Sequence, residues 1–206
     1  MNTRYLLFVS ILGMSVGAGW AQELAGKSAA AQLLRTNACQ NCNLTQANLA
    51  GMNLIGANLG GANLSGANLA SAVLIGADMR NAILTGANLS RANISGANLV
   101  GSQLVNANLD DAVASRTNLY QASAAGASFR RAKLEYVNFE GAELKGANFE
   151  GADFYEARFL FAELANASFA GADLSAADFS DASMPGVRTD PKTTCPDFQA
   201  GPCKFK

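Results

Sequence analysis

The sequence predicts an all-β solenoid, a four-sided β-helix of about seven coils with a cap at each end. Three observations predict it. A large apolar residue recurs at every fifth position from Leu44 to Met184. Alanine usually stands two positions before it, and glycine or asparagine is common two positions after it. A period of five fits neither the 3.6-residue turn of an α-helix nor the two-residue alternation of a β-strand.

A chain that turns a corner every five residues can point the large residue and the preceding alanine inward, once on each side. Four sides close a coil of ~20 residues, and coils stacked ~4.8 Å apart pair their backbone groups. Glycine and asparagine suit the corners, which need turn or left-handed backbone angles. The small and large inward residues fill the interior, so we expect a solid rod roughly 34 Å long with no lumen for a ligand.

Inward residues twenty positions apart should stack in four columns, which begin at Leu44, Leu49, Leu54 and Leu59 and are numbered first to fourth. Leucine predominates in the first half of the core and phenylalanine in the second. One zone departs from the pattern, because Ala114 and Ala124 replace large residues and Thr117 puts a hydroxyl where alanine is usual. Two interpretations remain for this zone: a local bulge or repacked layer, and a small internal cavity or hinge.

Residues 1–21 have the features of a secretory signal peptide. Arg4 gives a short positive region, Tyr5–Val16 are apolar, and Gly19 and Ala21 are the small residues before a cleavage site. The apolar run is shorter than the ~20 residues that span a bilayer. We therefore expect export to an oxidising compartment and no contact with the membrane after cleavage.

The rest of the chain divides into a body and two caps. Caps are expected because the end coils of a stacked solenoid otherwise leave backbone groups unpaired, which invites end-to-end association. The expected parts are an N-terminal capping helix and lead-in at 22–41, the repeats at 42–186, and an irregular or short-helical C-terminal cap at 187–206. The helix is expected over Glu23–Arg35, with Leu33 and Leu34 placed to cover the first coil.

The four cysteines lie only at the ends of the rod. Cys39 and Cys42 form a C-x-x-C pair, and Cys195 and Cys203 lie in the C-terminal cap. Four cysteines allow three pairings, but disulfide Cα atoms must lie within ~7 Å, so the length of the rod excludes pairing between ends. We expect disulfides Cys39–Cys42 and Cys195–Cys203. A redox-active C-x-x-C is the alternative for the first pair, although no thioredoxin-like context surrounds it.

Composition excludes several classes of function. The chain has 15 basic and 16 acidic residues, and this near-neutral balance argues against a dedicated surface for nucleic acid or anionic lipid. Histidine is absent, so a Ser-His-Asp or Cys-His catalytic arrangement is not available. We expect no catalytic residue, no cofactor and no metal site.

The five-residue units, such as Ala57-Asn58-Leu59-Gly60-Gly61 and Ala62-Asn63-Leu64-Ser65-Gly66, resemble those of the pentapeptide-repeat family. The resemblance covers residues 42–186 and implies a right-handed quadrilateral β-helix. Residues 33–44 also resemble a lead-in common among cyanobacterial members. That resemblance implies the periplasm or the thylakoid lumen as the location, with secretion as a third option.

Outward-facing aromatic and apolar residues gather near the edge between the third and fourth columns. They form a candidate interaction patch of Tyr120, Tyr136, Tyr155, Leu160 and Phe161. A contiguous exposed apolar patch usually marks an interaction site. The alternatives are that the C-terminal cap folds over the patch or that its side chains lie flat on the rod. Ile55, Val73 and Ile75 form a smaller patch on the third side.

Together these features predict a non-catalytic structural or protein-interaction scaffold with an unknown protein partner, as a monomer or an end-capped weak dimer. The resemblance implies one alternative, a DNA mimic that binds DNA gyrase, but such members need a strongly acidic rod, usually dimeric and in the cytoplasm. This chain is near neutral, expected to be exported, and carries Arg130, Arg131 and Lys133. A thiol–disulfide accessory acting through Cys39 and Cys42 is the other alternative.

Overall fold

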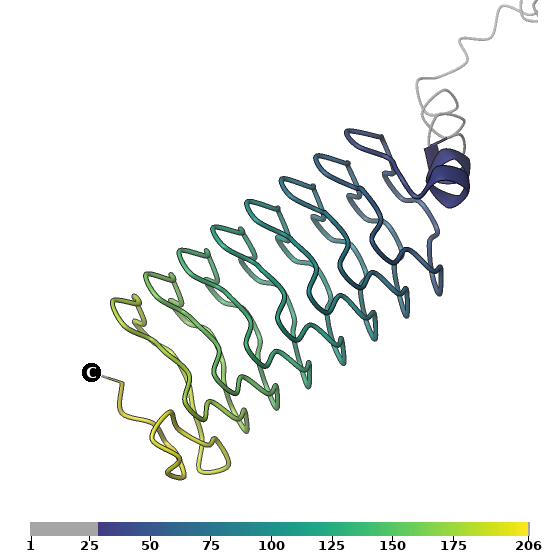
Figure 1. Cartoon of the computed structure of the whole chain (residues 1–206). Helices are drawn as coiled ribbons and strands as arrows, with labels where there is room; N and C mark the ends of the chain where they lie inside the picture. The colour runs from purple at the N-terminus through teal and green to yellow at the C-terminus, as the bar shows by residue number, and fades with distance from the viewer. Residues whose placement is uncertain (1–28, 206) are drawn as a thin grey trace, which may run out of the picture.

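The computed structural model describes residues 29–205, which form a rod of stacked coils (Figure 1). A helix over residues 29–36 stands at one end, and the chain advances along the rod so that each coil lies beside the next. The predicted signal peptide, residues 1–21, lies outside the described residues, as do residues 22–28 of the expected capping helix.

Single-residue parallel bridges hold the coils together. From Ala38↔Asn58 to Ser168↔Arg188, each bridge joins residues twenty positions apart, and successive bridges advance by five residues. Each side of a coil contributes a pair of bonds of the kind that Asp78 makes. Its carbonyl oxygen accepts from the Leu59 N–H at 2.7 Å, and its N–H donates to the Ala57 carbonyl at 2.9 Å. The predicted four-sided β-helix is confirmed.

The corners are tight turns with a left-handed third residue. At one of them the Ala62 N–H donates to the Leu59 carbonyl at 3.0 Å, and Gly61 has a φ of 65°. This backbone angle favours glycine, which explains the glycine two positions after the large residue. We call the sides the first to fourth faces, after the predicted columns, and name each corner by the faces that it joins. The 3/4 corner thus follows the third face, and the 4/1 corner follows the fourth.

The interior is filled along its length by buried leucine, then phenylalanine, with alanine between them. Phenylalanine rings stack within their columns: the Phe149 and Phe169 centroids are 4.8 Å apart, and those of Phe159 and Phe179 are 4.6 Å apart. Rings of neighbouring columns meet edge to face, as Phe149 and Phe154 do at 5.2 Å. The core is therefore a packed aromatic column in its second half.

The irregular zone keeps the regular spacing of the ladder, so it is not a bulge. Ala114, Ala124 and Thr117 are fully buried. The Thr117 hydroxyl donates to the Ile94 carbonyl at 2.8 Å, so the buried polar group is satisfied. The two alanines stand at large-residue positions on opposite faces of the coil that contains Phe129, the first phenylalanine of the core.

The N-terminal end begins one unit earlier than the expected boundary at residue 42. Asn37 has a φ of 54° and ends the helix, and the ladder starts at Ala38. Leu33 of the helix is fully buried against the first coil, as predicted. Leu34 is 52% exposed, so its predicted covering role is wrong. In a helix, neighbouring residues point in different directions, and only one of the two leucines can face the rod.

The C-terminal end keeps the ladder beyond residue 186, but with one extra residue. Asp173 pairs with Thr194, one position later than the regular spacing, and Thr194 then pairs antiparallel with Ala200. Residues 187–205 form turns and bridges without a helix, which matches the irregular form of the expected cap. Within residues 29–205, no helix combines the length and apolar character needed to cross a membrane.

Candidate interaction surface

The structure divides the five residues of the candidate patch between two corners. Tyr136 and Tyr155 lie at the 3/4 corner, as predicted from their distance to the third column. The other three lie at the 4/1 corner, on the far side of the fourth face: Tyr120, Leu160 and Phe161. The prediction of one edge is wrong for these three, because they follow residues of the fourth column rather than the third.

The 3/4 corner carries a cluster of three side chains from three successive coils. The Tyr136 and Tyr155 rings meet edge to face with centroids 5.7 Å apart. The guanidinium carbon of Arg116 lies 4.9 Å from the centre of the Tyr136 ring, within the range of a cation–π contact. The tyrosines are 43% and 37% exposed, so both have one face against the rod and another toward solvent.

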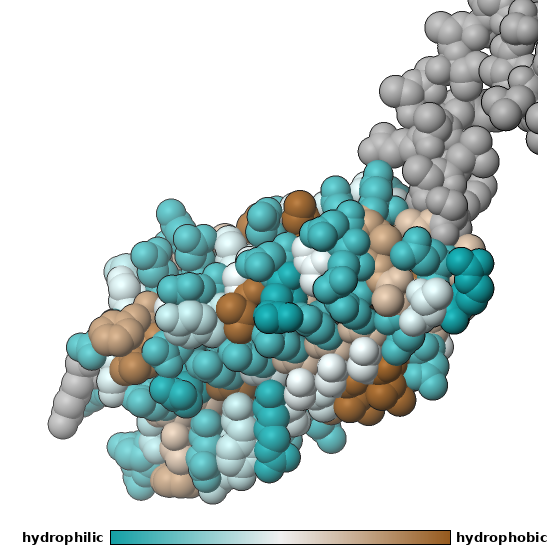
Figure 2. All heavy atoms as spheres, turned by 45° about the horizontal axis from the view of Figure 1, so that its top comes forward, coloured by the Kyte–Doolittle hydropathy of each residue, from teal (hydrophilic) through white to brown (hydrophobic). Residues whose placement is uncertain are grey.

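The 4/1 corner presents Phe161, which is 58% exposed, next to the half-buried Leu160. Between the two corners the fourth face is polar. Arg158 lies on it and donates to the Glu140 carboxylate at 2.9 Å. The surface is therefore a polar strip with aromatic side chains along both of its edges, not a continuous apolar patch. Figure 2 likewise shows hydrophobic side chains of the rod as separate areas among hydrophilic ones.

Two of the exposed aromatic residues occupy left-handed corner positions. Tyr136 has a φ of 59° and Phe161 a φ of 57°, where most other units place glycine, asparagine or another residue without a ring. A bulky side chain in this region is a genuine outlier and costs roughly 1–2 kcal/mol. Glycine would adopt the positive φ at both sites without this cost in stability. The rings therefore stand at positions that stability alone does not favour.

The smaller predicted patch lies partly on the same corner. Ile55 and Ile75 are exposed at the 3/4 corner, toward the N-terminal end, and Val73 is half-buried on the third face. Ser95, Ser115 and Glu135 separate these isoleucines from Tyr155 along the corner. The structure also exposes Met52 and Phe198, which the sequence pattern did not single out.

Two of the three basic residues named in the sequence analysis form ion pairs with acidic residues of adjacent coils. Arg131 binds Asp111 of the preceding coil at 2.8 Å, and Arg130 lies 3.4 Å from Glu150 of the following coil. The Arg131 guanidinium holds the pKa of the Asp111 carboxyl below its usual range. Charges thus alternate along the 2/3 corner, and neither sign dominates it.

Both cysteine pairs are bonded within their own end of the rod. Cys39 and Cys42 are linked with Cα atoms 5.2 Å apart, and Cys195 and Cys203 with Cα atoms 5.4 Å apart. Cys39 occupies a large inward position of the fourth face and is fully buried, whereas Cys42 is half-buried. This packing suits a structural bridge better than an exchangeable one, because a reactive cysteine needs an accessible, electropositive site.

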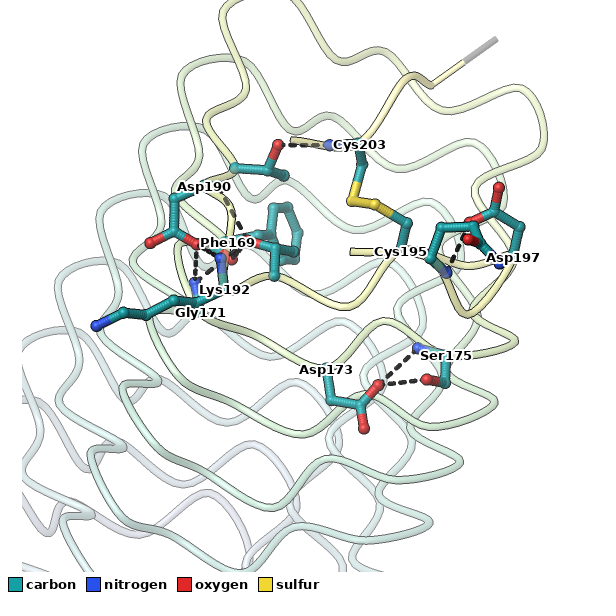
Figure 3. The surroundings of a disulfide bond; sticks show 12 residues. Phe169, Gly171, Asp173, Ser175, Asp190, Lys192, Cys195, Asp197 and Cys203 are labelled. Carbon is teal, nitrogen blue, oxygen red and sulfur yellow. Dashed lines mark hydrogen bonds between the residues drawn. A yellow bond between two sulfur atoms is a disulfide. The ribbon is translucent and has the colours of Figure 1, made fainter. Parts of the chain in front are cut away.

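A hydrogen-bonded cluster at the C-terminal cap was not predicted (Figure 3). The Asp190 carboxylate accepts from the Gly171 N–H at 2.9 Å and the Lys192 N–H at 3.0 Å. The buried Thr193 hydroxyl donates to the Phe169 carbonyl at 3.0 Å. The Gly171 N–H, and after it the Thr193 hydroxyl, hold the pKa of Asp190 below its usual value. This cluster replaces a regular ladder bond where the extra residue enters, and no periodic signal marks it.

Comparisons with known proteins place these features in context. The family model for pentapeptide repeats matches eight copies in overlapping segments from residue 38 to residue 188. A comparison with curated proteins finds no match.

Solved structures of other pentapeptide repeat proteins are similar to this chain. HetL, from the cyanobacterium Nostoc sp. strain PCC 7120 and involved in heterocyst differentiation regulation, is 28% identical over 80% of this chain and 88% of that one, with a TM-score of 0.47. A protein from the Arabidopsis thaliana thylakoid lumen is 26% identical over 67% and 72%, with a TM-score of 0.28. QnrB1, a plasmid-mediated fluoroquinolone resistance protein, is 22% identical over 72% and 87%, with a TM-score of 0.29. None of these likenesses assigns a function.

Proposed function

The chain belongs to the pentapeptide-repeat family, whose members fold as right-handed quadrilateral β-helices, and on that premise we propose that it is a non-catalytic scaffold that binds a protein partner. The partner binds across the fourth face, held by the aromatic side chains on its two edges. The observation that carries this proposal is the exposure of Tyr136 and Phe161 at left-handed positions. Aromatic side chains are enriched at protein interfaces, where they act as anchors.

The proposed location is an exported compartment, the periplasm or the thylakoid lumen. The predicted signal peptide supports export, and a bridge at each end of the rod suits an oxidising compartment. The proposed assembly state is a monomer or a weak dimer that leaves the fourth face free.

The two alternatives have less support. Mimicry of DNA needs a strongly acidic surface, whereas basic and acidic residues alternate along the 2/3 corner and nearly balance in the whole chain. Exchange of the Cys39–Cys42 bridge would require attack on a pair of which one member is fully buried.

The test compares captures from the exported fraction of the source organism by wild-type protein and by the double variant Tyr136→Gly/Phe161→Gly. Glycine removes both rings and relaxes both left-handed positions, so loss of binding would not reflect unfolding. The control is Arg91→Gly/Asn106→Gly, which makes the same backbone change at left-handed positions of other corners, with φ of 58° and 56°. We expect wild type and control to capture a protein that the ring-deleted variant loses. Identical captures by all three would contradict the proposal.

A further inference from the structure

The last coil of the rod leaves backbone groups without partners on two faces. In the coil before it, the Phe159 N–H donates to the Asp178 carbonyl at 2.7 Å, and the Phe161 N–H donates to the Ser180 carbonyl at 3.2 Å. The last coil has no coil above its fourth and first faces. Within residues 29–205, no hydrogen-bond acceptor is present for the N–H groups of Phe179, Asp181, Met184 and Gly186, and no donor for the carbonyls of Ala177 and Ala182.

These groups are open because the chain leaves the helical path at the cap. After Pro196 the chain turns back, and the Cys195 N–H donates to the Gln199 carbonyl at 2.7 Å. The antiparallel bridge between Thr194 and Ala200 and the disulfide from Cys195 to Cys203 hold this return. The cap continues the second and third faces, and the fourth and first faces end with an unpaired edge. Such an edge is a ready template for another strand.

A hollow of about 520 Å³, lined by both apolar and polar residues, adjoins the unpaired edge. Phe179 and Met184, the last large inward residues of the fourth and first faces, are only half-buried there. Phe205 forms part of the wall, with its ring 5.1 Å from that of Phe179. The volume lies within the range of sites that enclose a small ligand or a few side chains. An occupant would complete the burial of two core residues.

We infer that this end of the rod binds a segment of a partner protein by β-augmentation, and that the segment turns the 4/1 corner as a further coil would. The segment takes the place of the missing coil over the fourth and first faces, and it puts a large apolar side chain into the hollow above Phe179 and Met184. A polypeptide backbone that follows the path of a coil is the occupant that fits, because the open groups continue the coil-to-coil ladder in position and polarity. A second rod fits less well, since the cap already occupies part of the end (Figure 1). The inference rests on the proposed scaffold role but concerns a different surface.

The probe is a labelled ten-residue peptide with the sequence of residues 157–166, which covers the same two faces one coil earlier. In the rod, the Arg158 N–H donates to the Val137 carbonyl and the Glu163 N–H to the Ala142 carbonyl, both at 2.9 Å. In the peptide these two N–H groups would meet the open carbonyls of Ala177 and Ala182. Fluorescence anisotropy with the full, oxidised chain should show saturable binding. A peptide N-methylated at these two positions keeps every side chain but should bind at least about tenfold more weakly.

Variants of the protein test the hollow. Met184→Asp should weaken peptide binding at least about tenfold, whereas Phe198→Ser, at an exposed cap residue outside the hollow, should leave it unchanged. Slower amide hydrogen exchange at Phe179 and Met184 in the bound wild-type protein gives a measure that does not depend on folding of the variant. Equal binding of both peptides, or unslowed exchange, would overturn the inference. The inference would also be overturned if the peptide failed to bind while the chain associated with itself and Met184→Asp abolished that self-association. Unchanged peptide binding by Tyr136→Gly/Phe161→Gly separates this site from the fourth-face surface.

Discussion

The Tyr155 ring meets the Tyr136 ring edge to face across the step between two successive coils, with centroids 5.7 Å apart. Inside the rod, rings of neighbouring columns also meet edge to face, as Phe149 and Phe154 do, whereas rings of successive coils in one column stack. The difference is that the Phe149 and Phe154 rings are fully buried, whereas the tyrosines keep much of their surface in solvent. Held by one another and by Arg116, they form a rigid anchor that loses little conformational freedom when a partner binds.

Replacement of Phe161 by glycine should not destabilise the rod. The residue has a φ of 57° and its side chain is 58% exposed, so glycine removes backbone strain at the cost of few contacts. We expect the free energy of unfolding, measured by chemical denaturation, to rise by up to about 1 kcal/mol. Phe161→Ala removes the ring but keeps the Cβ atom, and it should give no such gain. A glycine variant less stable than the alanine variant would show that the position is not strained.

The repeat period makes most of the fold predictable. The position of a residue in its five-residue unit decides whether its side chain points inward, and its bridge partner lies twenty residues away. The same spacing assigns each outward residue to a corner, provided that the face of the large residue just before it is identified first. Tyr120 and Phe161 follow Leu119 and Phe159 of the fourth column, whereas Tyr155 follows Phe154 of the third, so they lie at different corners. The cluster around Asp190 was not predictable, since it depends on one extra residue beyond the end of the period.

Replacement of Ala124 by leucine separates the two interpretations of the irregular zone. Ala124 and Ala114 are fully buried in the coil that contains Phe129. If this layer is repacked and full, Ala124→Leu should lower the free energy of unfolding by about 1–3 kcal/mol through overpacking. A parallel Leu104→Ala variant, one coil earlier in the same column, should cost about 2–5 kcal/mol. A gain in stability for Ala124→Leu in thermal or denaturant unfolding would show that a cavity was present.

Acid should loosen the C-terminal cap through Asp190. The backbone N–H of Gly171 is the main cause that holds the pKa of this carboxylate below its usual value. A lowered pKa in the folded state means that the ionised carboxylate stabilises the cap above its unfolded pKa, about 3.9, and that this stability is lost as the pH falls through the folded pKa. Hydrogen exchange at the Gly171 amide should therefore accelerate, relative to the intrinsic rate, below that range. Asp190→Asn should show fast exchange already at neutral pH and no difference from wild type in acid; a constant difference at every pH would contradict this account.

Loss of the two disulfides should have local and unequal effects. The bridge between Cys195 and Cys203 closes a longer loop than the one between Cys39 and Cys42, so its removal by paired serine substitution should cost about 2–3 kcal/mol, against about 1–2 kcal/mol for the N-terminal bridge. Because the ladder of the rod does not pass through the C-terminal bridge, hydrogen exchange should rise at the Cys195 and Phe198 amides, whose bonds hold the return of the cap, and stay slow at core amides such as that of Phe149.

In the folded wild-type protein, mild dithiol reductant should leave the Cys39–Cys42 bridge intact, since Cys39 is fully buried. Rapid reduction of that bridge while the cap bridge persists would contradict a structural role and support the thiol–disulfide alternative.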